Sequence, residues 1–436
     1  LSKIKDISKG TKFLGYETCS YEGRVIAIIQ GDQLVDEATT SSEVTVVLDQ
    51  TPFYGESGGQ IGDTGVLETD GVHVQITDTK KNNDFILHIG KVVKGALKKG
   101  NVVHAKVNVQ RRNAIRRNHS ATHILHYALR RVIGQHAEQA GSLVLPDRLR
   151  FDFHHFSSLT KEELTRIEDL VNEKILENAP VCAKESTLQA ARNAGAMALF
   201  GEKYGETVRV VTLGDFSKEL CGGTHINNAG EVGLLRIISE SSVAAGIRRI
   251  EAITGIEVLS RSREKETIIQ EVCDTLNTPE DKLITKTREI LNELKNLQKE
   301  IHKTKQKELS SKIGSFFESA KVVSNVKIIT KKLDDATADD LRKTIDMLMK
   351  SGEGLAIVLG TSQNGRVTII AALSPNLVKR GLHAGNISKE VAKVVGGGGG
   401  GRPDMAQAGG QWADKLDEAL CFATELLSNK ILQGSS

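Results

Sequence analysis

Two pairs of residues in this sequence have the types and the spacing of metal ligands. His119 and His123 lie in a segment with helical periodicity, and four residues advance a helix by about 400°. Both imidazoles are therefore expected on one helix face, one turn apart. Far downstream, Cys221 and His225 enclose Gly-Gly-Thr, and the paired glycines are expected to let the backbone turn tightly.

Each pair alone is a weak signal, but one thiolate and three imidazoles together suit tetrahedral zinc. The predicted ligands of one Zn²⁺ are His119, His123, Cys221 and His225. His126, one further turn along the helix, is either a competing ligand or an ordinary core or surface residue. Four protein ligands normally mark a structural zinc, whereas hydrolysis needs an open position, and the sequence leaves both open. Ser120 stands where an HExxH peptidase has Glu, which argues against that class.

The elements that must position these residues change along the chain. The first 107 residues hold β-rich runs separated by Gly, Asp and Asn, as in a small β-barrel. A helix over about 108–134 carries the His pair, and Thr160 with Glu163 predicts a capped helix over 158–177. The strands predicted around these helices are 142–153, 207–212, 233–240 and 248–254.

The remaining residues predict a long charged helical segment and a second α/β region. Heptad spacing runs from Leu283 to Ile301, and Thr278-Pro279 interrupts the helix early. The heptads fit either a helix packed against its own domain or a coiled coil between two copies. The later elements are strands 326–330, 354–359 and 367–372, helices 338–349, 388–395 and 411–428, and a glycine-rich loop at Gly396–Gly401.

The fold class predicted from these patterns is α+β multidomain, in four parts. The parts are a β-barrel at 1–107, an α/β zinc domain at 108–255, a coiled-coil-like helical linker at 256–318, and a C-terminal α/β domain at 319–436.

Composition restricts the function classes only weakly. Among 436 residues, Lys+Arg number 58 and Asp+Glu 55, so overall charge does not indicate a nucleic-acid partner. Five scattered cysteines are not a disulfide framework and indicate a reducing compartment. No apolar run approaches the roughly 20 residues of a membrane span. With Leu1 first and no signal-peptide core, we expect a soluble cytoplasmic chain that begins inside a longer gene product, an organellar matrix or stroma being the alternative.

Four motifs resemble those of alanyl-tRNA synthetases. They are Thr51-Pro-Phe-Tyr through Gly58-Gly-Gln60, Arg116 through His126, Cys221-Gly-Gly-Thr-His225, and the glycine run followed by Arg402-Pro-Asp-Met-Ala-Gln-Ala-Gly-Gly410. The resemblance covers the editing and C-terminal (C-Ala) portions of that family, and the editing part is similar to free-standing AlaX deacylases. No segment is recognised as the ATP-binding and aminoacylation domain. The resemblance therefore implies a deacylase that lacks the ligase site.

The implied reaction is zinc-dependent hydrolysis of tRNA(Ala) that carries Ser or Gly. An alanine pocket cannot strongly reject glycine, nor an analogue that merely adds a hydroxyl, so a second hydrolytic site is needed. Thr122 and Gln139 match family positions that line the amino-acid pocket, and both are expected to hydrogen-bond the serine hydroxyl. Cys221 is expected to act as a ligand thiolate and not as a nucleophile. Positioning of the water near zinc suffices without a side-chain base.

Contacts to tRNA are predicted at both ends of the chain. Arg116 and Arg117 are candidates for phosphates of the acceptor end, although the neighbouring arginines cannot all share one helical face. The glycine run lacks the Lys-Ser/Thr of a P-loop, so a nucleoside triphosphate is not expected there. It is either a loop whose backbone amides approach phosphate or sugar closely, or simply a flexible loop. The resemblance implies that the C-terminal domain binds the outer corner of the tRNA, with Lys393 and Arg402 as contacts.

Three alternatives stay open at this point. The first is that the chain is a fragment of a synthetase, and the second is that it is a free-standing AlaX-type trans-editing deacylase. The third is a tRNA-binding module whose zinc is purely structural. A homodimer through the helical linker or the C-terminal domain is also open, because the heptads fit one chain or two.

Overall fold

The structure is a computed structural model that describes residues 10–198, 205–311, 313–363 and 365–433. It divides into two compact units, Leu1–Val272 and Cys273–Ser436, and the boundary falls within helix α5 (Ile256–Thr275). No helix within the described ranges is long and apolar enough to cross a membrane. The division into four parts stays a prediction.

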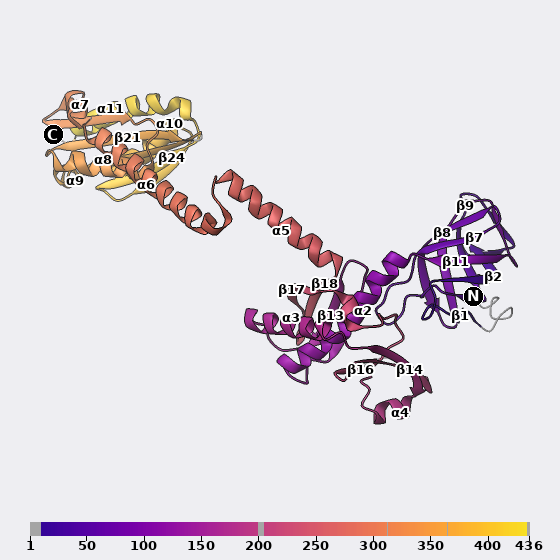
Figure 1. The fold of residues 1–436 in the computed structure, drawn as a ribbon. Coiled ribbons are helices and arrows are strands. Elements are labelled where there is room, and N and C mark those ends of the chain that lie inside the picture. The colour runs from indigo at the N-terminus through magenta and orange to yellow at the C-terminus, as the bar shows by residue number, and fades with distance from the viewer. Residues whose placement is uncertain (1–9, 199–204, 312, 364, 434–436) are drawn as a thin grey trace. The chain divides into compact units, whose positions relative to one another are not determined.

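The first unit begins with a closed six-stranded antiparallel barrel, as the β-rich runs predicted (Figure 1). Its strands, in spatial order, are β11 (Val102–Val107), β7 (Gly65–Thr69), β8 (Val72–Asn82), β9 (Phe85–Lys94), β5 (Glu43–Leu48) and β2 (Ser20–Gln30), and β11 pairs with β2 to close it. Alternate residues such as Val44, Val46 and Leu48 point inward and fill the core. Short strands flank the barrel: β3 (Gln33–Val35), the pair β4 (Glu37–Thr39) and β10 (Ala96–Lys98), and the pair β1 (Lys12–Phe13) and β6 (Gln50–Thr51).

Helix α2 (Val109–Val132) follows the barrel directly and confirms the predicted helix. Its cap, Asn108, accepts a hydrogen bond from the Arg111 amide at 3.0 Å. The side chain of Arg112 is fully buried against the Asp63 carboxylate, and its Nη1 donates to the Gly15 carbonyl at 2.8 Å. This buried ion pair joins the start of α2 to the loop between β6 and β7. Arg112 is therefore committed to structure and not to RNA.

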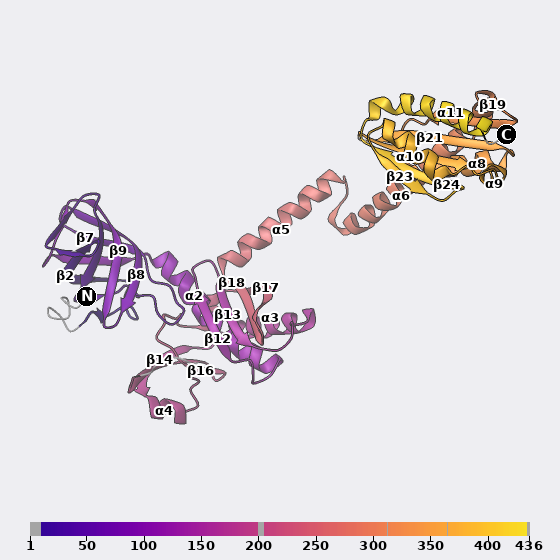
Figure 2. The ribbon, with the colours of Figure 1, turned by 180° about the vertical axis from the view of Figure 1, so that it is seen from behind.

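A second helix and a four-stranded sheet pack against α2 (Figure 2). Helix α3 (Lys161–Leu176) lies beside it and begins with the predicted Thr160–Glu163 capping box. A four-stranded antiparallel sheet has the order β12 (Gln139–Val144), β13 (Leu149–His154), β18 (Ile247–Thr254) and β17 (Leu235–Ala244). A three-stranded sheet consists of β14 (Val181–Thr187), β15 (Thr207–Leu213) and β16 (Ser217–Leu220), accompanied by α4 (Leu188–Asn193) and the 3₁₀ turn η1 (Ala229–Val232).

The second unit contains one six-stranded mixed sheet with helices on both faces. Its strand order is β19 (Lys321–Val323), β20 (Val326–Lys332), β21 (Leu355–Gln363), β22 (Arg366–Leu373), β24 (Met405–Gly410) and β23 (Gly398–Gly401). The helices are α6 (Leu283–Ser311), α7 (Ile313–Glu318), α8 (Ala338–Lys350), α9 (Pro375–Lys379), α10 (Ala384–Val394) and α11 (Leu416–Gln433), with 3₁₀ turns η2 (Glu280–Lys282) and η3 (Ala413–Lys415). Adjacent residues face opposite cores: Ile328 packs with α10 and α11, and Ile329 packs with α7 and α8.

Three sequence expectations for this unit differ from the structure, and the first is that α10 begins at Ala384 and not at residue 388. The glycine run is not a loop, because Gly398–Gly401 forms edge strand β23 paired with β24. The final helix begins at Leu416 and not near residue 411, because the amides of Gln411 and Trp412 donate to the Val395 carbonyl instead. In α6 the heptad side chains Leu294, Leu297 and Ile301 are each more than half exposed, so a coiled coil between copies stays a prediction.

Candidate metal centre

Helix α2 presents two imidazoles side by side, as their spacing predicted. The His119 and His123 rings stack with centroids 5.5 Å apart and planes 14° from parallel. Both residues are buried, and the helix between them is regular.

The loop after β16 brings the other two candidate ligands to the same place. Arg209 supports this loop, because its Nη1 donates to the carbonyls of Cys221 at 3.0 Å and Gly223 at 2.9 Å. The Tyr16 hydroxyl donates to the Gly222 carbonyl at 2.6 Å, and the Arg209 guanidinium lies over the Tyr16 ring. Gly223 is needed for space, and neither glycine is needed for a left-handed turn, since neither has a positive φ. A Cβ at Gly223 would lie 2.0 Å from His119 Cε1.

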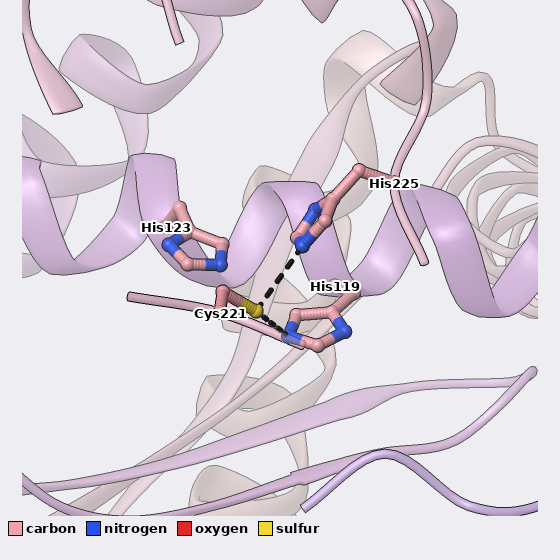
Figure 3. Close-up of side chains that lie close together, drawn as sticks. All are labelled: His119, His123, Cys221 and His225. Carbon is pink, nitrogen blue, oxygen red and sulfur yellow. Dashed lines mark hydrogen bonds between the residues drawn. The ribbon is translucent and has the colours of Figure 1, made fainter. Parts of the chain in front are cut away.

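Four side chains converge on one point in Figure 3. The Sγ of Cys221 lies 3.3 Å from the Nε2 of His119 and 3.3 Å from the Nε2 of His225. The candidate ligand atoms of all four residues, His123 included, lie within 4.8 Å of one another. This group could hold a metal ion, and its donor set of one sulfur and three imidazole nitrogens fits tetrahedral zinc.

Each imidazole is also held by its second nitrogen. His119 Nδ1 lies 2.7 Å from Gln60 Oε1, and His225 Nδ1 lies 3.0 Å from Ser120 Oγ. His123 Nδ1 is 2.8 Å from a carboxylate oxygen of Glu219. Such partners fix ring orientation and leave the remaining nitrogen to face an ion.

Glu219 contacts a further imidazole as well. Its other oxygen lies 3.0 Å from His126 Nδ1, so His126 reaches the carboxylate and is not among the four candidate ligands.

The electrostatics of the group keep Cys221 and His225 in the forms that bind metal, whereas His123 holds a proton. Burial raises the pKa of the Cys221 thiol, but His119 and His225 outweigh it and hold that pKa well below its ordinary value. Burial lowers the pKa of His225 to about 3, so this imidazole is neutral. Burial also lowers the pKa of His123, but the Glu219 carboxylate outweighs it and raises the pKa to about 10. A metal cation would replace the proton that His123 holds beside two anions.

A cavity of about 300 Å³ opens onto this group, and we call it the metal cavity. His119, His123 and Cys221 contribute to its wall. Thr122 and Gln139 line the same cavity, so the structure places both predicted pocket residues beside the candidate ligands. The Thr122 hydroxyl donates to the Asn118 carbonyl at 2.8 Å, and Gln139 Nε2 donates to Ser142 Oγ at 3.2 Å.

The four predicted RNA contacts lie outside the metal cavity. Arg116 lines a separate cavity with His225, and its Nη2 donates to the Gly15 carbonyl at 3.4 Å. Arg117 is half-buried. In the second unit Lys393 is exposed, and Arg402 forms an exposed ion pair with Asp404 at 3.4 Å.

Sequence reasoning missed the residues that support the ligands. Gln60 lies within a motif that was recognised, but no role followed from it. Glu219 lies two residues before Cys221, and this closeness in the sequence to a candidate ligand was the signal that could have identified it. Ser120, Tyr16 and Arg209 carry no spacing signal at all, because only the fold brings them to the loop.

Three family models match the chain. That of tRNA synthetases class II (A) covers residues 1–111, the threonyl and alanyl tRNA synthetase second additional domain covers 208–251, and the DHHA1 domain covers 325–429. We expected no segment that resembles the aminoacylation part of such a synthetase. Because residues 1–111 match the class II synthetase model, this expectation is not confirmed. Similarity to AlaX deacylases stays a prediction.

Curated relatives and a solved structure are similar to this chain. The alanine–tRNA ligase of Acetivibrio thermocellus is 49% identical over 428 residues, which are 98% of this chain and 48% of that protein. That of Alkaliphilus oremlandii is 46% identical over 97% of this chain and 48% of its own length. The C-Ala domain of Aquifex aeolicus alanyl-tRNA synthetase is 27% identical, with a TM-score of 0.24, over 25% of this chain and 98% of that domain. The chain spans about half the length of the curated relatives it matches, and over almost all of its own length it is similar to alanine–tRNA ligases.

Proposed function

We propose that this chain hydrolyses the ester of tRNA(Ala) mischarged with serine or glycine, using one zinc ion held by His119, His123, Cys221 and His225. The observation that carries the proposal is the convergence of these ligands, three of which line a cavity that Thr122 and Gln139 also line. The relatives are alanine–tRNA ligases, which supply the class of substrate.

When bound, zinc would supply a Lewis acid beside the ester carbonyl. The chain's own residues position the reaction. Gln60, Ser120 and Glu219 contact the three imidazoles through their second nitrogens. Cys221 would serve as a thiolate ligand and not as a nucleophile. An aminoacyl ester is already reactive, and orientation of ester and water within the cavity supplies the rest of the acceleration.

Thr122 and Gln139 would recognise the serine side chain. The Thr122 hydroxyl gives its hydrogen to Asn118, which leaves its oxygen to accept from the serine hydroxyl. Glycine and alanine both lack that hydroxyl, so both would leave the polar wall unpaired and would bind less tightly than serine.

The second unit would bind the tRNA away from the acceptor end. Lys393 and Arg402 are exposed near strand β23 and suit phosphate contacts. Whether the chain acts within a synthetase or as a free-standing trans-editing deacylase does not change this division of roles.

The test is deacylation of Ser-tRNA(Ala) by the zinc-loaded chain, with Ala-tRNA(Ala) as the control substrate. We expect selective loss of serine, abolished by chelation and restored by zinc. Cys221→Ala should lose zinc and at least about 100-fold of the activity. Cys182→Ala, an exposed cysteine of the same unit, should keep both. Full zinc-dependent deacylation by Cys221→Ala would overturn the ligand assignment.

A second candidate function is a tRNA-binding module with purely structural zinc. The closed set of four protein ligands favours it, since catalytic zinc usually keeps an open position. It predicts zinc and tRNA binding without turnover, so the same assay separates the two functions.

A further inference from the structure

Two further imidazoles of the first unit meet, and neither belongs to the candidate metal centre. The Nε2 of His136 lies 2.9 Å from the Nδ1 of His155, and the two ring planes are 21° from parallel. Neither residue is among the four candidate ligands. His155 is buried, whereas His136 is exposed. We call these two residues the histidine pair.

The surrounding structure holds His155 in place and leaves His136 at the surface. His155 directly follows strand β13, and its amide donates to the Gly246 carbonyl at 3.0 Å. His136 lies in the turn between α2 and β12. The ring of Phe156, which is 83% exposed, lies 4.6 Å from that of His155 and 6.1 Å from that of His136. An apolar ring at the surface therefore lies beside both imidazoles.

Two imidazole nitrogens at this distance either share a hydrogen bond or face a common ion. Two nitrogens bound to one tetrahedral zinc ion lie about 3.3 Å apart, so the pair needs to open by only about 0.4 Å. The exposed ring of His136 has room to make that shift. The candidate metal centre shows the same closeness of donor atoms, because Cys221 Sγ lies 3.3 Å from two imidazole nitrogens.

The surroundings of His155 favour the form that binds a metal. Burial lowers the pKa of His155, and the neighbouring His136 lowers it further, so the ring is neutral at pH 7. When Nδ1 offers its lone pair to an ion, the ring proton lies on Nε2. That nitrogen is 3.3 Å from Ser157 Oγ, which can accept the hydrogen bond and so orient the ring.

We propose that the histidine pair binds a second divalent transition-metal ion, with water completing its coordination. Imidazole nitrogen is a ligand that suits zinc, copper and nickel. Two protein ligands hold an ion less tightly than four, so this ion exchanges readily and binds after the candidate metal centre is filled. The inference goes beyond the proposed function and does not depend on ester hydrolysis.

The bound ion would also restrain the segment that leads to Gln139. Gln139 begins β12 and pairs with Phe153 on β13, and the His154 amide donates to the Glu138 carbonyl at 3.0 Å. The histidine pair joins the same two segments through side chains. Metal binding should therefore slow hydrogen exchange at this end of the sheet.

The zinc stoichiometry of the full chain tests the assignment. In equilibrium dialysis with zinc in excess over the candidate metal centre, we expect two zinc ions per chain, of which a weak chelator removes one. His136→Asn should weaken the second ion at least tenfold and keep the first. His154→Asn is the matched control, because this exposed histidine points to the other side of β13 and should leave both ions bound.

Cobalt and hydrogen exchange show where the second ion lies. The first equivalent of Co²⁺ should give the charge-transfer absorption of a thiolate ligand. The second should add only weaker absorption, because the histidine pair contains no sulfur, and His136→Asn should lose that addition. The second equivalent of zinc should slow exchange of the Gln139 amide in the wild type and in His154→Asn but not in His136→Asn.

The outcomes separate a metal site from a simple hydrogen bond. One zinc ion per chain in the wild type, or a second ion that His136→Asn binds as tightly, would overturn the proposal. The histidine pair would then only join two segments by a hydrogen bond. Two zinc ions that respond to His136→Asn, in a chain that does not hydrolyse Ser-tRNA(Ala), would support the second site and refute only the proposed function.

Discussion

At the scale of single residues, the candidate metal centre depends on Gly223, because this position has no room for a Cβ. A methyl group at Gly223 would meet His119 Cε1 at 2.0 Å and Gln60 Oε1 at 2.9 Å, both held in place by their own contacts. Gly223→Ala should therefore push the His119 ring off the ion and lower zinc content severalfold at limiting zinc. Gly222→Ala is the matched control, because its Cβ would meet nothing within 4 Å. Equal zinc content in the two variants, measured by atomic absorption, would contradict this account.

The hydroxyl of Thr122 provides a test of serine recognition. Thr122→Val keeps the shape of the side chain but removes the hydroxyl of a residue that lines the metal cavity. We expect kcat/KM for Ser-tRNA(Ala) to fall about tenfold and that for Gly-tRNA(Ala) to change little. Equal losses on both substrates would show that Thr122 supports the fold of the site and not its selectivity.

A buried histidine in the barrel links stability to pH. His88 Nδ1 donates to the Val46 carbonyl at 3.0 Å, and its Nε2 accepts from the Thr51 hydroxyl at 2.7 Å, so the ring is neutral. Burial lowers its pKa from 6.5 to about 4. Because the unfolded chain takes up the proton first, stability is lost as pH falls from about 6.5 to about 4, by about 3 kcal/mol in total.

The measurement for His88 is amide hydrogen exchange in strands β5 and β9 as a function of pH. His88→Phe should be less stable at pH 7, since two polar partners lose their bonds. The protection factors of these amides in the His88→Phe variant, corrected for intrinsic exchange, should fall less steeply below pH 6.5 than those in the wild type. Parallel curves would mean that other groups carry the acid sensitivity.

The sequence predicted the candidate ligands but not what supports them. His119 and His123 were found because helical spacing is local information. Gln60 and Ser120 are partners across the fold, and no pattern in the sequence joins either of them to a ligand. The glycines were noticed for the wrong reason, because packing against His119 and not turn geometry requires Gly223.

At the scale of elements, the glycine run shows why a strand was taken for a loop. A run of identical small residues has no hydrophobic alternation, so the sequence gives no β signal. What alternates is the space beside each glycine. A Cβ at Gly399 would lie 2.4 Å from Ala408 Cα, whereas one at Gly400 would meet nothing within 4 Å. The helices and inner strands were predictable because their apolar periods are explicit.

This alternation predicts opposite results for neighbouring substitutions. Gly399→Ala should destabilise the second unit by about 1–3 kcal/mol, because β23 would be forced away from β24. Gly400→Ala should change stability by less than about 0.5 kcal/mol. Urea unfolding followed by the fluorescence of Trp412, which lies in this unit, measures both. Similar midpoints for the two variants would refute the register of the edge strand.

At the scale of the whole molecule, two units with separate cores should respond separately to metal. The candidate ligands all lie in Leu1–Val272, whereas the chain's single tryptophan, Trp412, lies in Cys273–Ser436. A metal ion that binds only the folded state stabilises only the unit that contains its site, unless the folding of the two units is coupled. Chelation should therefore lower the urea midpoint for unfolding of the first unit, measured by hydrogen exchange in β5 and β9. It should leave the urea midpoint of the second unit, measured by Trp412 fluorescence, unchanged.

His225→Ala gives the same comparison without a chelator. It should reproduce the lower stability of the first unit and again spare the Trp412 transition, because no ligand to the ion comes from the second unit among the described residues. A Trp412 midpoint that shifts with zinc would mean that the units fold as one, and loss of the metal would then also impair the tRNA contacts proposed at Lys393 and Arg402. An unshifted midpoint means that the second unit can hold tRNA while the first is metal-free, so zinc would control hydrolysis without controlling binding.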